Sequence, residues 1–583
     1  MEYVISSIIL LTSLLQGGYF HTPFLAAGVI FVATGVVVRK RRLSTAEITL
    51  WTFSCIYLIT SLLRGYSSDS IAQACLPGTV AASLYCYEGL EWEKKKRTLQ
   101  VLAYASAVFA GIGILALGRV WNISGAVTSH RLQFPFQYAN AAGSWYAALA
   151  LFRQDVAQKE QRWEALPLRT ALFLTRSLGA LGLYGAVEAA IAFRERKMPE
   201  RWQGLLIENA FSAVFAAGFY LLRGWWTVLL LAAMYCAGVW EWKLRAIARK
   251  AYLHWLVLAA GMAGIYPIIK SGRVVEGLLT FTERLYQIKD GLHIIADYPL
   301  TGIGAGRWAY LYPYYQSARY VTTVVHSSLI QVGVDAGIFA VAFAIAFVMI
   351  SWRRGKRLPQ AGMAAALLIS HSLLDFNFQF YPLCCLMVFL LFSGDEQKDG
   401  KKSVRIQWQT VALASFAVLC SILLVAEQNY KQLIHSNAAN NWTGTLSQYE
   451  RCNTLFGMNP LARKSAAYAA YQAGNLELCL ALTGDEQLLD TETVLLRAEA
   501  LYAQTGKDDA ARYLLGVLEG RRYQQGLYQL GGDALRRWGA DEETLLRHKQ
   551  IAENTELSDF ERRVEAFKIE KQTMREEHNE ASD

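Results

Sequence analysis

The sequence predicts an all-α protein that crosses a membrane many times. Hydrophobic residues make up 54% of the chain and aromatic residues 12%, whereas charged residues contribute only 18%. This composition is more apolar than that of most soluble domains. The apolar residues also fall in runs of about 20, the length that spans the hydrocarbon core of a bilayer as one helix. We therefore expect residues 1–430 to form a polytopic bundle of transmembrane helices.

Short basic clusters between the apolar runs predict the orientation of this bundle. Seven clusters lie beside apolar runs, at residues 39–42, 94–97, 153–162, 194–201, 243–250, 353–357 and 398–405. Loops rich in Lys and Arg resist translocation, so the positive-inside rule places all seven on the cytoplasmic side. The net charge of +9 is then explained by these clusters, which orient the protein in the membrane. We therefore expect no nucleic-acid partner.

The apolar runs can be paired so that every basic cluster stays inside. The paired runs are 45–63 with 69–87, 99–119 with 139–152, 203–221 with 224–240, 252–270 with 327–350, and 359–374 with 379–394. The run at 3–17 has neither a basic segment before it nor a small-residue cleavage site after it, so we expect a retained span. This pairing makes residues 270–326 a large extracytoplasmic loop. A last span at 407–426 takes the C-terminal region outside.

Residues 166–192 do not fit this scheme as a pair of full spans, because 27 residues suit one tilted helix better. The polar sequence Thr175-Arg176-Ser177 interrupts the run near its centre. Two half-helices that meet at the interruption restore the pairing, and irregular backbone at membrane depth is tolerated where it lines a cavity. We expect a broken or re-entrant hairpin, with one continuous helix as the alternative.

The C-terminal region reads as a separate helical domain over residues 436–557. Gly474, Gly506 and Gly539 each end a helix-like pattern and recur at intervals of about 33 residues, close to the roughly 34-residue tetratricopeptide period. Such helix pairs offer a concave surface that binds a protein partner or a glycan. A structural cap on the membrane domain is the equal alternative. Residues 558–583 are predicted to be a charged tail, helical or disordered.

Several polar residues stand at the predicted outer face or inside the membrane. An arginine within a membrane is costly enough to imply a partner or an anionic ligand, and this applies to Arg176. His371 and Asp375 are spaced to share one helix face. The full set of candidates is Arg131, Asn140, Arg176, Arg284, Arg307, His326, His371 and Asp375.

Other site types lack support in the sequence. The glycine alternation from Gly302 to Gly306 has no preceding strand and lacks the dinucleotide-binding spacing. There is no phosphate-binding loop of the Walker type and no zinc motif, and the nine cysteines include no CxxC pair. No pair of aspartates in an outside loop suits a metal-bound sugar nucleotide. We therefore expect neither a cofactor nor a metal.

A cationic outer pocket with one histidine suits transfer from a lipid diphosphate. Arginines bind phosphate oxygens in bidentate fashion and stabilise the diphosphate as it leaves. A neutral histidine, whose pKa is ordinarily near neutral pH, can take the proton of an attacking sugar hydroxyl. A transporter or a structural channel remains an alternative on these residues alone.

The combined motifs carry a family resemblance. They are Arg284, then Asp297-Tyr-Pro-Leu-Thr-Gly-Ile-Gly-Ala-Gly306, then His326-Ser-Ser-Leu-Ile-Gln-Val-Gly-Val-Asp-Ala-Gly337. This pattern closely resembles the O-antigen ligase and polymerase family of bacterial membrane glycosyltransferases, over about residues 20–395. The segments Arg131 to Asn140 and His371 to Asp375 are similar to further pieces of that family.

The resemblance implies a GT-C-like membrane bundle in the bacterial cytoplasmic membrane. Its implied activity is metal-independent transfer of a glycan from undecaprenyl diphosphate to an acceptor hydroxyl on the outer face. The acceptor is expected to be a glycan, a lipid or a protein. The other expected partners are the lipid bilayer and a protein that binds the helical repeats. His326 matches the family's essential histidine and Arg284 one of its essential arginines.

The chain departs from the family pattern at one position. Leu178 stands in Ser177-Leu178-Gly179-Ala180 where the family usually has arginine. Arg176 could take its place if the broken helix turns that side chain inward. Ligase and polymerase share the donor and stay open, with the ligase as the first hypothesis. A lipid-linked glycan flippase and an inactive scaffold are the alternatives from other classes.

Overall fold

We describe the protein from a computed structural model. It describes residues 1–38, 43–65, 67–154, 162–240, 243, 259, 273–354, 359–394, 406–451, 459–485, 488–555, 561–564 and 566. The predicted span at 252–270, apart from one position, and the basic clusters at 39–42 and 398–405 lie outside these residues. So do most of the cluster at 243–250 and residues 567–583 of the predicted tail.

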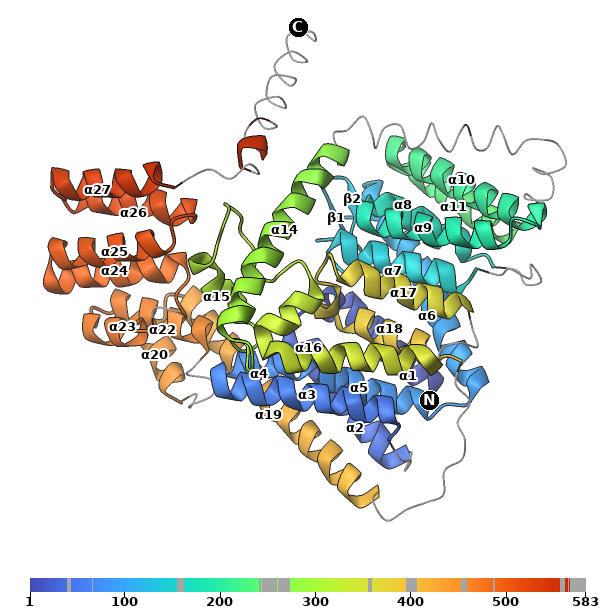
Figure 1. Ribbon diagram of the computed structural model, residues 1–583, viewed down its shortest axis with the longest axis horizontal. Coiled ribbons are helices and arrows are strands. Elements are labelled where there is room, and N and C mark those ends of the chain that lie inside the picture. The colour runs from blue at the N-terminus through green and yellow to red at the C-terminus, as the bar shows by residue number, and fades with distance from the viewer. Residues whose placement is uncertain are drawn as a thin grey trace, which may run out of the picture. The chain divides into compact units, whose positions relative to one another are not determined.

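The described residues fold almost entirely into helices, in agreement with the predicted class (Figure 1). Two short antiparallel strands, β1 (Val127–Thr128) and β2 (Arg131–Leu132), form the one sheet found in the described part of the chain. The chain divides into two compact units. The first comprises Met1–Ser54, Leu76–Gly277 and Ala342–Ser421, and the second comprises Cys55–Cys75, Leu278–Val341 and Ile422–Asp583.

The helices of the first unit are α1 (Glu2–Leu14), α2 (His21–Val38), α5 (Leu76–Glu88), α6 (Trp92–Leu117), α7 (Ala139–Phe152), α8 (Ala165–Thr175), α9 (Leu178–Arg194), α10 (Pro199–Leu221), α11 (Trp225–Val239), α17 (Pro359–Ser372) and α18 (Tyr381–Phe392). Four helices contribute residues to both units, namely α3 (Thr45–Arg64), α14 (Arg273–Asp297), α16 (Ser328–Arg354) and α19 (Ile406–Ala438). The remaining helices of the second unit are α4 (Ser68–Ala74), α15 (Trp308–Leu311), α20 (Trp442–Arg451), α22 (Pro460–Gln472), α23 (Leu476–Leu482), α24 (Thr491–Thr505), α25 (Lys507–Gly520), α26 (Gln525–Arg537) and α27 (Glu542–Glu553).

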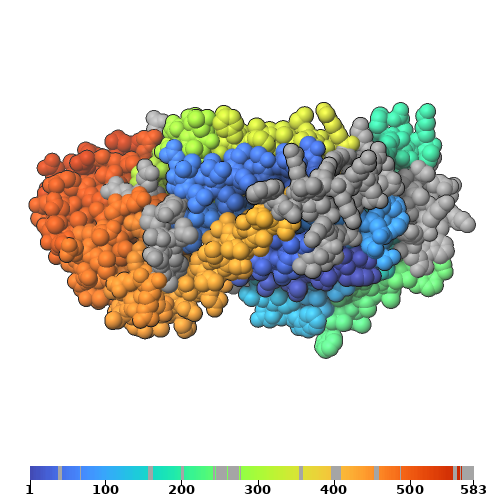
Figure 2. Space-filling view, turned by 90° about the horizontal axis from the view of Figure 1, so that it is seen from below, coloured from blue at the N-terminus to red at the C-terminus, as the bar shows by residue number. Residues whose placement is uncertain are grey.

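Among the described residues, five helices are long and apolar enough to cross a membrane. They are Thr45–Arg64, Trp92–Leu117, Trp202–Leu221, Ser328–Arg353 and Gln409–Ala438. Each contains one of the predicted runs or most of it. In the last of them only 22% of the most apolar window is buried, and Figure 2 shows the side of α19 lying open. Apolar side chains left exposed on such helices suit contact with lipid. Several apolar helices thus have the character expected of a multi-pass membrane protein.

The run predicted as a span at 69–87 is divided into two helices, and its crossing of the membrane stays a prediction. The chain forms α4 up to Ala74 and then α5 from Leu76, with Cys75 between them. Pro77 has no backbone N–H, and its ring conflicts with the carbonyl four residues earlier. The proline therefore interrupts the hydrogen-bond ladder at the point where the two helices meet.

The predicted break in residues 166–192 is confirmed. Helix α8 ends at Thr175 and α9 starts at Leu178, with Arg176 in the left-handed region at φ 50°. The side chain of Ser177 accepts a hydrogen bond from the backbone N–H of Ala180 and so caps the start of α9. The interruption that looked costly in an apolar run is thus a helix end followed by a capped helix start.

Helices α8 and α9 both pack against α7 and return to the same end of it. Arg153 directly follows α7 and pairs with Glu164, which directly precedes α8. Gln154 donates to Oε1 of Glu188 on α9 at 2.7 Å. Both outer ends of the pair therefore lie beside the end of α7, while the break lies near its beginning, where Gly143 approaches Ser177. This is the hairpin that the polar interruption predicted.

The C-terminal part of the second unit is a series of paired helices (orange to red in Figure 1). Helix α22 packs on α23, α24 on α25, and α26 on α27. Leu514, Leu518, Leu527 and Leu535 form part of one buried apolar core that joins the last pairs. Gly474 and Gly539 have positive φ just after a helix end, where glycine carries little steric cost. The tetratricopeptide assignment and the domain boundaries at 436 and 557 stay predictions.

Candidate functional site

A partly buried polar cluster in the first unit brings together residues from segments far apart in the sequence. Arg131 donates from Nε to the carbonyl of Thr175 at 2.9 Å and from Nη2 to Oδ1 of Asn140 at 2.8 Å. Asn140 in turn donates from Nδ2 to Oδ2 of Asp375 at 2.7 Å. Three of the residues singled out from the sequence therefore form one hydrogen-bonded chain. Arg131 also donates to a carbonyl in the last turn of α8. The last carbonyls of a helix have no partner within the helix and need a donor from elsewhere.

Asp375 organises this cluster from beyond the end of a helix. Helix α17 stops at Ser372, so the prediction that His371 and Asp375 share one helix face was wrong. The carboxylate of Asp375 accepts the hydroxyl of Tyr138 at 2.9 Å and the backbone N–H of Phe376 at 2.9 Å, and it is fully buried. These partners compete with the continuation of α17, since a carboxylate that bonds a neighbouring N–H favours a turn.

The segment that carries Arg131 folds back onto the helices. Gly113 on α6 leaves space for Leu132 and Phe134, and Tyr146 on α7 donates its hydroxyl to the carbonyl of Phe134 at 3.0 Å. Phe136 is buried and packs its ring on Trp145 at 5.4 Å between centroids. The loop is thereby held firmly, and Arg131 and Asn140 are placed by packing at both ends of it.

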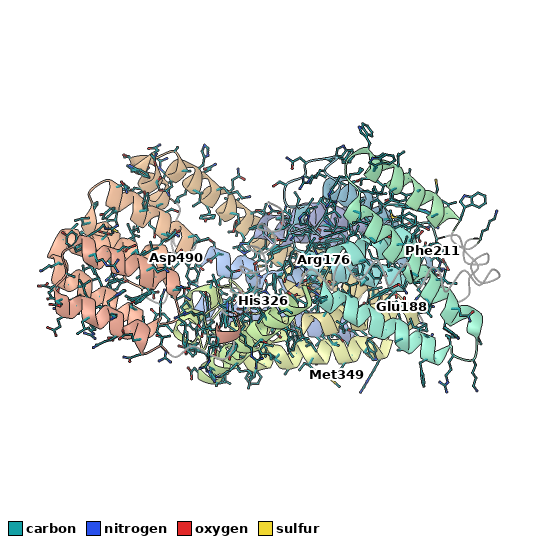
Figure 3. All side chains as sticks on the ribbon, turned by 90° about the horizontal axis from the view of Figure 1, so that it is seen from above. Arg176, Glu188, Phe211, His326, Met349 and Asp490 are labelled. Atoms are coloured by element: carbon teal, nitrogen blue, oxygen red, sulfur yellow. The ribbon has the colours of Figure 1, made fainter. Side chains whose placement is uncertain are left out.

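Arg176 is turned into the first unit at the α8–α9 break (labelled in Figure 3). Its residue exposure is 7%, and Nη1 donates to the hydroxyl of Tyr220 on α10 at 3.1 Å. The guanidinium carbon also lies 5.4 Å from the centre of the Tyr220 ring. Because Arg131 bonds the carbonyl of Thr175, the residue before Arg176, the two arginines come from adjoining parts of the cluster.

Leu178, which directly follows Ser177 at the start of α9, makes an apolar contact. Its Cδ1 lies 2.4 Å from the position that a Cβ on Gly277 would take, so the leucine packs closely on α14 at that glycine. The position is therefore filled by apolar packing, while the buried cation of this turn is Arg176.

His371 lies on the other side of the same break. Nδ2 of Asn377 donates to Nδ1 of His371 at 2.7 Å and to Oγ of Ser144 at 3.2 Å. The Asn377 amide thus ties the imidazole of His371 to α7. Nε2 lies 3.1 Å from the position of a Cβ on Gly179, so this glycine lets α9 approach the imidazole closely.

His326 lies in the second unit and is held by Gln287 of α14 (labelled in Figure 3). Oε1 of Gln287 accepts the backbone N–H of His326 at 3.1 Å and faces Nδ1 of the ring at 2.8 Å. Nε2 of Gln287 donates to Glu283 at 3.1 Å, which fixes the orientation of the amide. Nδ1 of His326 must then carry the hydrogen, and Nε2 is the basic nitrogen of the neutral ring.

Arg284 neighbours this arrangement on α14. Burial raises the pKa of Glu283, whereas the hydrogen bond from Gln287 and the positive charge of Arg284 act in the opposite direction. Gln287 and Asp290 are fully buried on the same helix. The face of α14 that points into the unit is therefore unusually polar, with a carboxylate and an amide directed at the segment that carries His326.

The residues between His326 and Gly337 hold that segment in place. Gln331 accepts the backbone N–H of Val325 at 2.7 Å and donates to Oδ1 of Asp335 at 2.8 Å. Oδ2 of Asp335 accepts the hydroxyl of Tyr57 on α3 at 2.5 Å. These hydrogen bonds tie the irregular segment before α16 to that helix, and they tie α16 to α3. Val325 and His326 each receive a side-chain acceptor for their backbone N–H.

The glycine run meets α16 where that helix is broken at Gly337, which has φ 77° and ψ −177°. Ile303 and Gly304 donate their N–H groups to the carbonyls of Val334 and Asp335 at 2.8 and 3.0 Å. Ile338 donates to the carbonyl of Pro299 at 2.8 Å. A Cβ on Gly302 would lie 2.4 Å from the carbonyl oxygen of Val334, so only glycine fits this backbone contact.

Arg307 is placed by contacts within the second unit. Its Nη2 donates to Oγ of Ser67 at 2.8 Å and to the carbonyl of Gly65, and the residue is 5% exposed. These bonds hold the chain that leaves α3. The predicted role of Arg307 in substrate binding stays a prediction, since the described contacts are structural.

The eight candidates from the sequence fall into two groups. Arg131, Asn140, Arg176, His371 and Asp375 belong to the cluster of the first unit, and Arg284, His326 and Arg307 belong to the second unit. Sequence reasoning missed Gln287, Asp290 and Tyr57 as partners. Gln287 and Asp290 could have been noticed because they are polar residues on the face of an amphipathic helix that is otherwise expected to be apolar and buried.

Among the described residues, no three His, Cys, Asp or Glu side chains are placed to hold a metal ion. Comparison with known proteins adds no relative. No family model, no curated protein and no solved structure matches this chain.

Proposed function

We propose that this chain is a membrane glycan ligase that transfers an oligosaccharide or polysaccharide from undecaprenyl diphosphate to an acceptor hydroxyl. The observation that carries the proposal is the hydrogen bond between Gln287 and Nδ1 of His326, at 2.8 Å. It makes Nε2 the basic nitrogen of a neutral imidazole, which is the form that a general base needs. The family resemblance of the loop motifs supplies the donor and the reaction class.

In the proposed reaction Nε2 of His326 takes the proton of the acceptor hydroxyl. The acceptor oxygen then bonds to the anomeric carbon of the donor glycan, and the bond from that carbon to the diphosphate oxygen breaks. The diphosphate leaves with the electron pair of that bond. Arg284 is proposed to stabilise its developing negative charge, as arginines do for phosphate oxygens.

The polar cluster of the first unit supports a role in binding the diphosphate or the acceptor. Arg131 and Arg176 supply two cations from adjoining segments. Arg131 donates to Asn140, which donates to Asp375, and His371 lies close to Gly179 near the start of α9. Arg176 is buried, and a buried cation is held only where partners or ligands offset the loss of hydration. That Arg176 is turned inward supports its taking the place of the arginine that Leu178 replaces.

The placement in the membrane is also part of the proposal. We propose that residues 270–326 and the C-terminal helices lie on the outer face of a bacterial cytoplasmic membrane. The five apolar helices and the basic clusters between the apolar runs support this orientation. We propose that the paired C-terminal helices either bind a protein or a glycan or serve as a structural cap on the membrane domain.

The test uses the full chain in lipid nanodiscs with lipid-linked glycan from the strain that carries it. Membranes of that strain serve as the source of acceptor. The wild type is expected to release undecaprenyl diphosphate without ATP or added metal, and His326→Ala is expected to lose this by a factor on the order of 10² or more. His293→Ala is the matched control, since that histidine is exposed on the same helix α14.

The products separate the alternatives. Transfer of intact glycan to a new acceptor supports a ligase, whereas a ladder of longer lipid-linked glycans identifies a polymerase. Movement of the donor across the bilayer with no bond change indicates a flippase. Equal release by the wild type and by His326→Ala contradicts the proposed role of the histidine, and no release by the wild type indicates a scaffold.

A further inference from the structure

The tyrosine-rich segment of residues 310–320 is attached to α14 close to His326. Asp290 of α14 accepts the backbone N–H of Ser317 at 3.1 Å, its hydroxyl at 2.7 Å, and the hydroxyl of Tyr320 at 2.6 Å. Burial and the Asp290 carboxylate raise the pKa of Tyr320, so its hydroxyl stays protonated and donates. Asp290 lies one helical turn from Gln287, the residue that bonds His326.

The same segment is attached on its other side to the C-terminal helices. Arg521, which follows α25, places its guanidinium carbon 4.5 Å from the centre of the Tyr314 ring. Gly520 lies so close that a Cβ there would be 3.2 Å from Tyr314. Arg521 is itself fixed, because Nη1 donates to the carbonyl of Leu489 at 2.8 Å and the residue is 2% exposed.

Two further contacts join the segment to the C-terminal part. Gln524 donates its amide nitrogen to Oε1 of Gln316. Arg319 forms an ion pair with Glu561 at 3.2 Å, and its backbone N–H also donates to that carboxylate, at 3.3 Å. Glu561 is 5% exposed, so this pair is shielded from water on the acidic side. A partly buried pair of this kind is screened less by salt than an ion pair on an open surface.

Gln316 connects the two sides. Its oxygen accepts from Gln524, while its nitrogen donates to the carbonyls of Tyr320 at 2.7 Å and Ala318 at 3.3 Å. Tyr320 is the residue whose hydroxyl bonds Asp290. An unbroken series of hydrogen bonds therefore runs from the turn after α25, through the tyrosine-rich segment, to α14.

We propose that the C-terminal helices regulate the transfer site by holding the tyrosine-rich segment on α14, and that Arg521 and Gln524 are positioning residues for His326. This rests on the proposed function, because it assigns a consequence for transfer to the contacts. When the contacts are intact, Asp290 keeps its three donors and α14 presents Gln287 to His326. When these contacts are lost, the tyrosine-rich segment becomes more mobile, and Gln287 no longer holds the imidazole of His326 in its position for transfer.

The experiment compares Arg521→Ala/Gln524→Ala with the wild type in the full chain. Amide hydrogen exchange of peptides covering residues 284–294 and 310–326 is measured together with transfer from lipid-linked glycan. The double variant is expected to exchange faster in both regions and to lose transfer by roughly tenfold to a hundredfold, since small misplacements of catalytic groups have effects of that size. The loss should lie in kcat rather than in KM.

A second variant and a control separate positioning from general damage. Tyr314→Leu removes the aromatic ring that faces Arg521 and leaves Arg521 bonded to Leu489. This variant should therefore show the same faster exchange and loss of transfer as the double variant, without disturbing α24 to α26. Arg536→Ala removes only an exposed pair with Asp533 and should change neither readout. Faster exchange with unchanged transfer overturns the regulatory role. Unchanged exchange in residues 310–326 overturns the contact itself, and this arm stands even if the wild type shows no transfer.

Discussion

Gln287 binds His326 through a single oxygen that meets both the backbone and the ring of the histidine. Oε1 lies 3.1 Å from the backbone nitrogen and 2.8 Å from Nδ1. One buried amide therefore fixes the position of the chain and the tautomer of the imidazole together. This relationship explains why a glutamine, with both a donor and an acceptor, suits the position better than an apolar residue.

Replacing Gln287 by glutamate, together with Glu283→Gln so that two carboxylates do not face each other, is expected to change the pH dependence of transfer. A carboxylate beside Nδ1 stabilises the protonated ring, and a protonated ring cannot take a proton from the acceptor. The acidic limb of the pH profile of kcat/KM should therefore move to higher pH, while the rate at alkaline pH stays near that of the wild type. Gln287→Leu should lose transfer at every pH by a factor on the order of 10². An unshifted limb in the glutamate variant would show that His326 is not the base.

Gly337→Ala is expected to destabilise the second unit. Its backbone has φ 77° and ψ −177°, and a new Cβ would lie 2.6 Å from the carbonyl carbon of Leu300. The backbone conformation alone costs roughly 1–3 kcal/mol for a residue other than glycine, and the contact with main-chain atoms adds to it. The midpoint of thermal unfolding in nanodiscs should fall. Gly362→Ala on α17 is the control, because nothing lies within 4 Å of its Cβ position and alanine favours a helix.

Asp375→Ala is expected to disrupt the polar cluster of the first unit. It removes the fully buried carboxylate that accepts from both Tyr138 and Asn140, and Asn140 then keeps only the Tyr138 hydroxyl as an acceptor for its Nδ2. Loss of the acceptor of a buried donor costs about 1–3 kcal/mol. Both the unfolding midpoint and the rate of transfer should fall. Asp533→Ala, which removes an exposed pair with Arg536, should shift the midpoint very little. A fully stable and active Asp375→Ala would contradict the organising role of this carboxylate.

Asp490 is expected to make the C-terminal helices sensitive to acid. Burial opposes ionisation of this carboxyl, but hydrogen bonds from Lys464 and Thr493 outweigh it and lower the pKa of Asp490 below its ordinary value. A carboxyl with a lowered pKa in the folded state stabilises the fold above its ordinary pKa of about 3.9, and this contribution is lost as the pH falls through the lowered value.

Asp490→Asn tests this dependence, because asparagine keeps the helix cap of α24 and removes the charge. At pH 7 the variant should unfold at a lower temperature than the wild type, and the difference should shrink towards pH 3. Asp541→Asn, at the exposed cap of α27, is the matched control and should give a smaller difference at pH 7. A difference that is constant with pH would exclude the charge as its cause.

Local features of the chain were predicted from the sequence because their causes are local. Runs of about 20 apolar residues gave the five long apolar helices, and a polar interruption in a short run gave the break at Arg176. Pro77 was an equally local signal, and it explains why the run at 69–87 is two helices. The loop motifs also marked His326 and the position of Gly337, where α16 is broken.

The partners of these residues were not predictable in the same way. Asp375 and Tyr138 are 237 residues apart in the sequence, and the pair forms only because α7 and the end of α17 pack together. The expected helix face shared by His371 and Asp375 was lost to those distant donors. Gln287 and Asp290 gave no motif, and their roles appear only where the folded chain brings His326 and Tyr320 beside them.

By itself, then, the sequence determined where the chain is apolar, where its helices break and which charged residues are costly enough to need partners. These properties follow from the cost of moving each side chain and backbone group out of water, which depends on local composition. Only the tertiary structure decided which donor meets which acceptor, that Arg176 is turned inward beside Leu178, and that a buried amide sets the tautomer of His326. Hydrogen bonds act over a few ångströms, so they are fixed by packing between segments that the sequence leaves far apart.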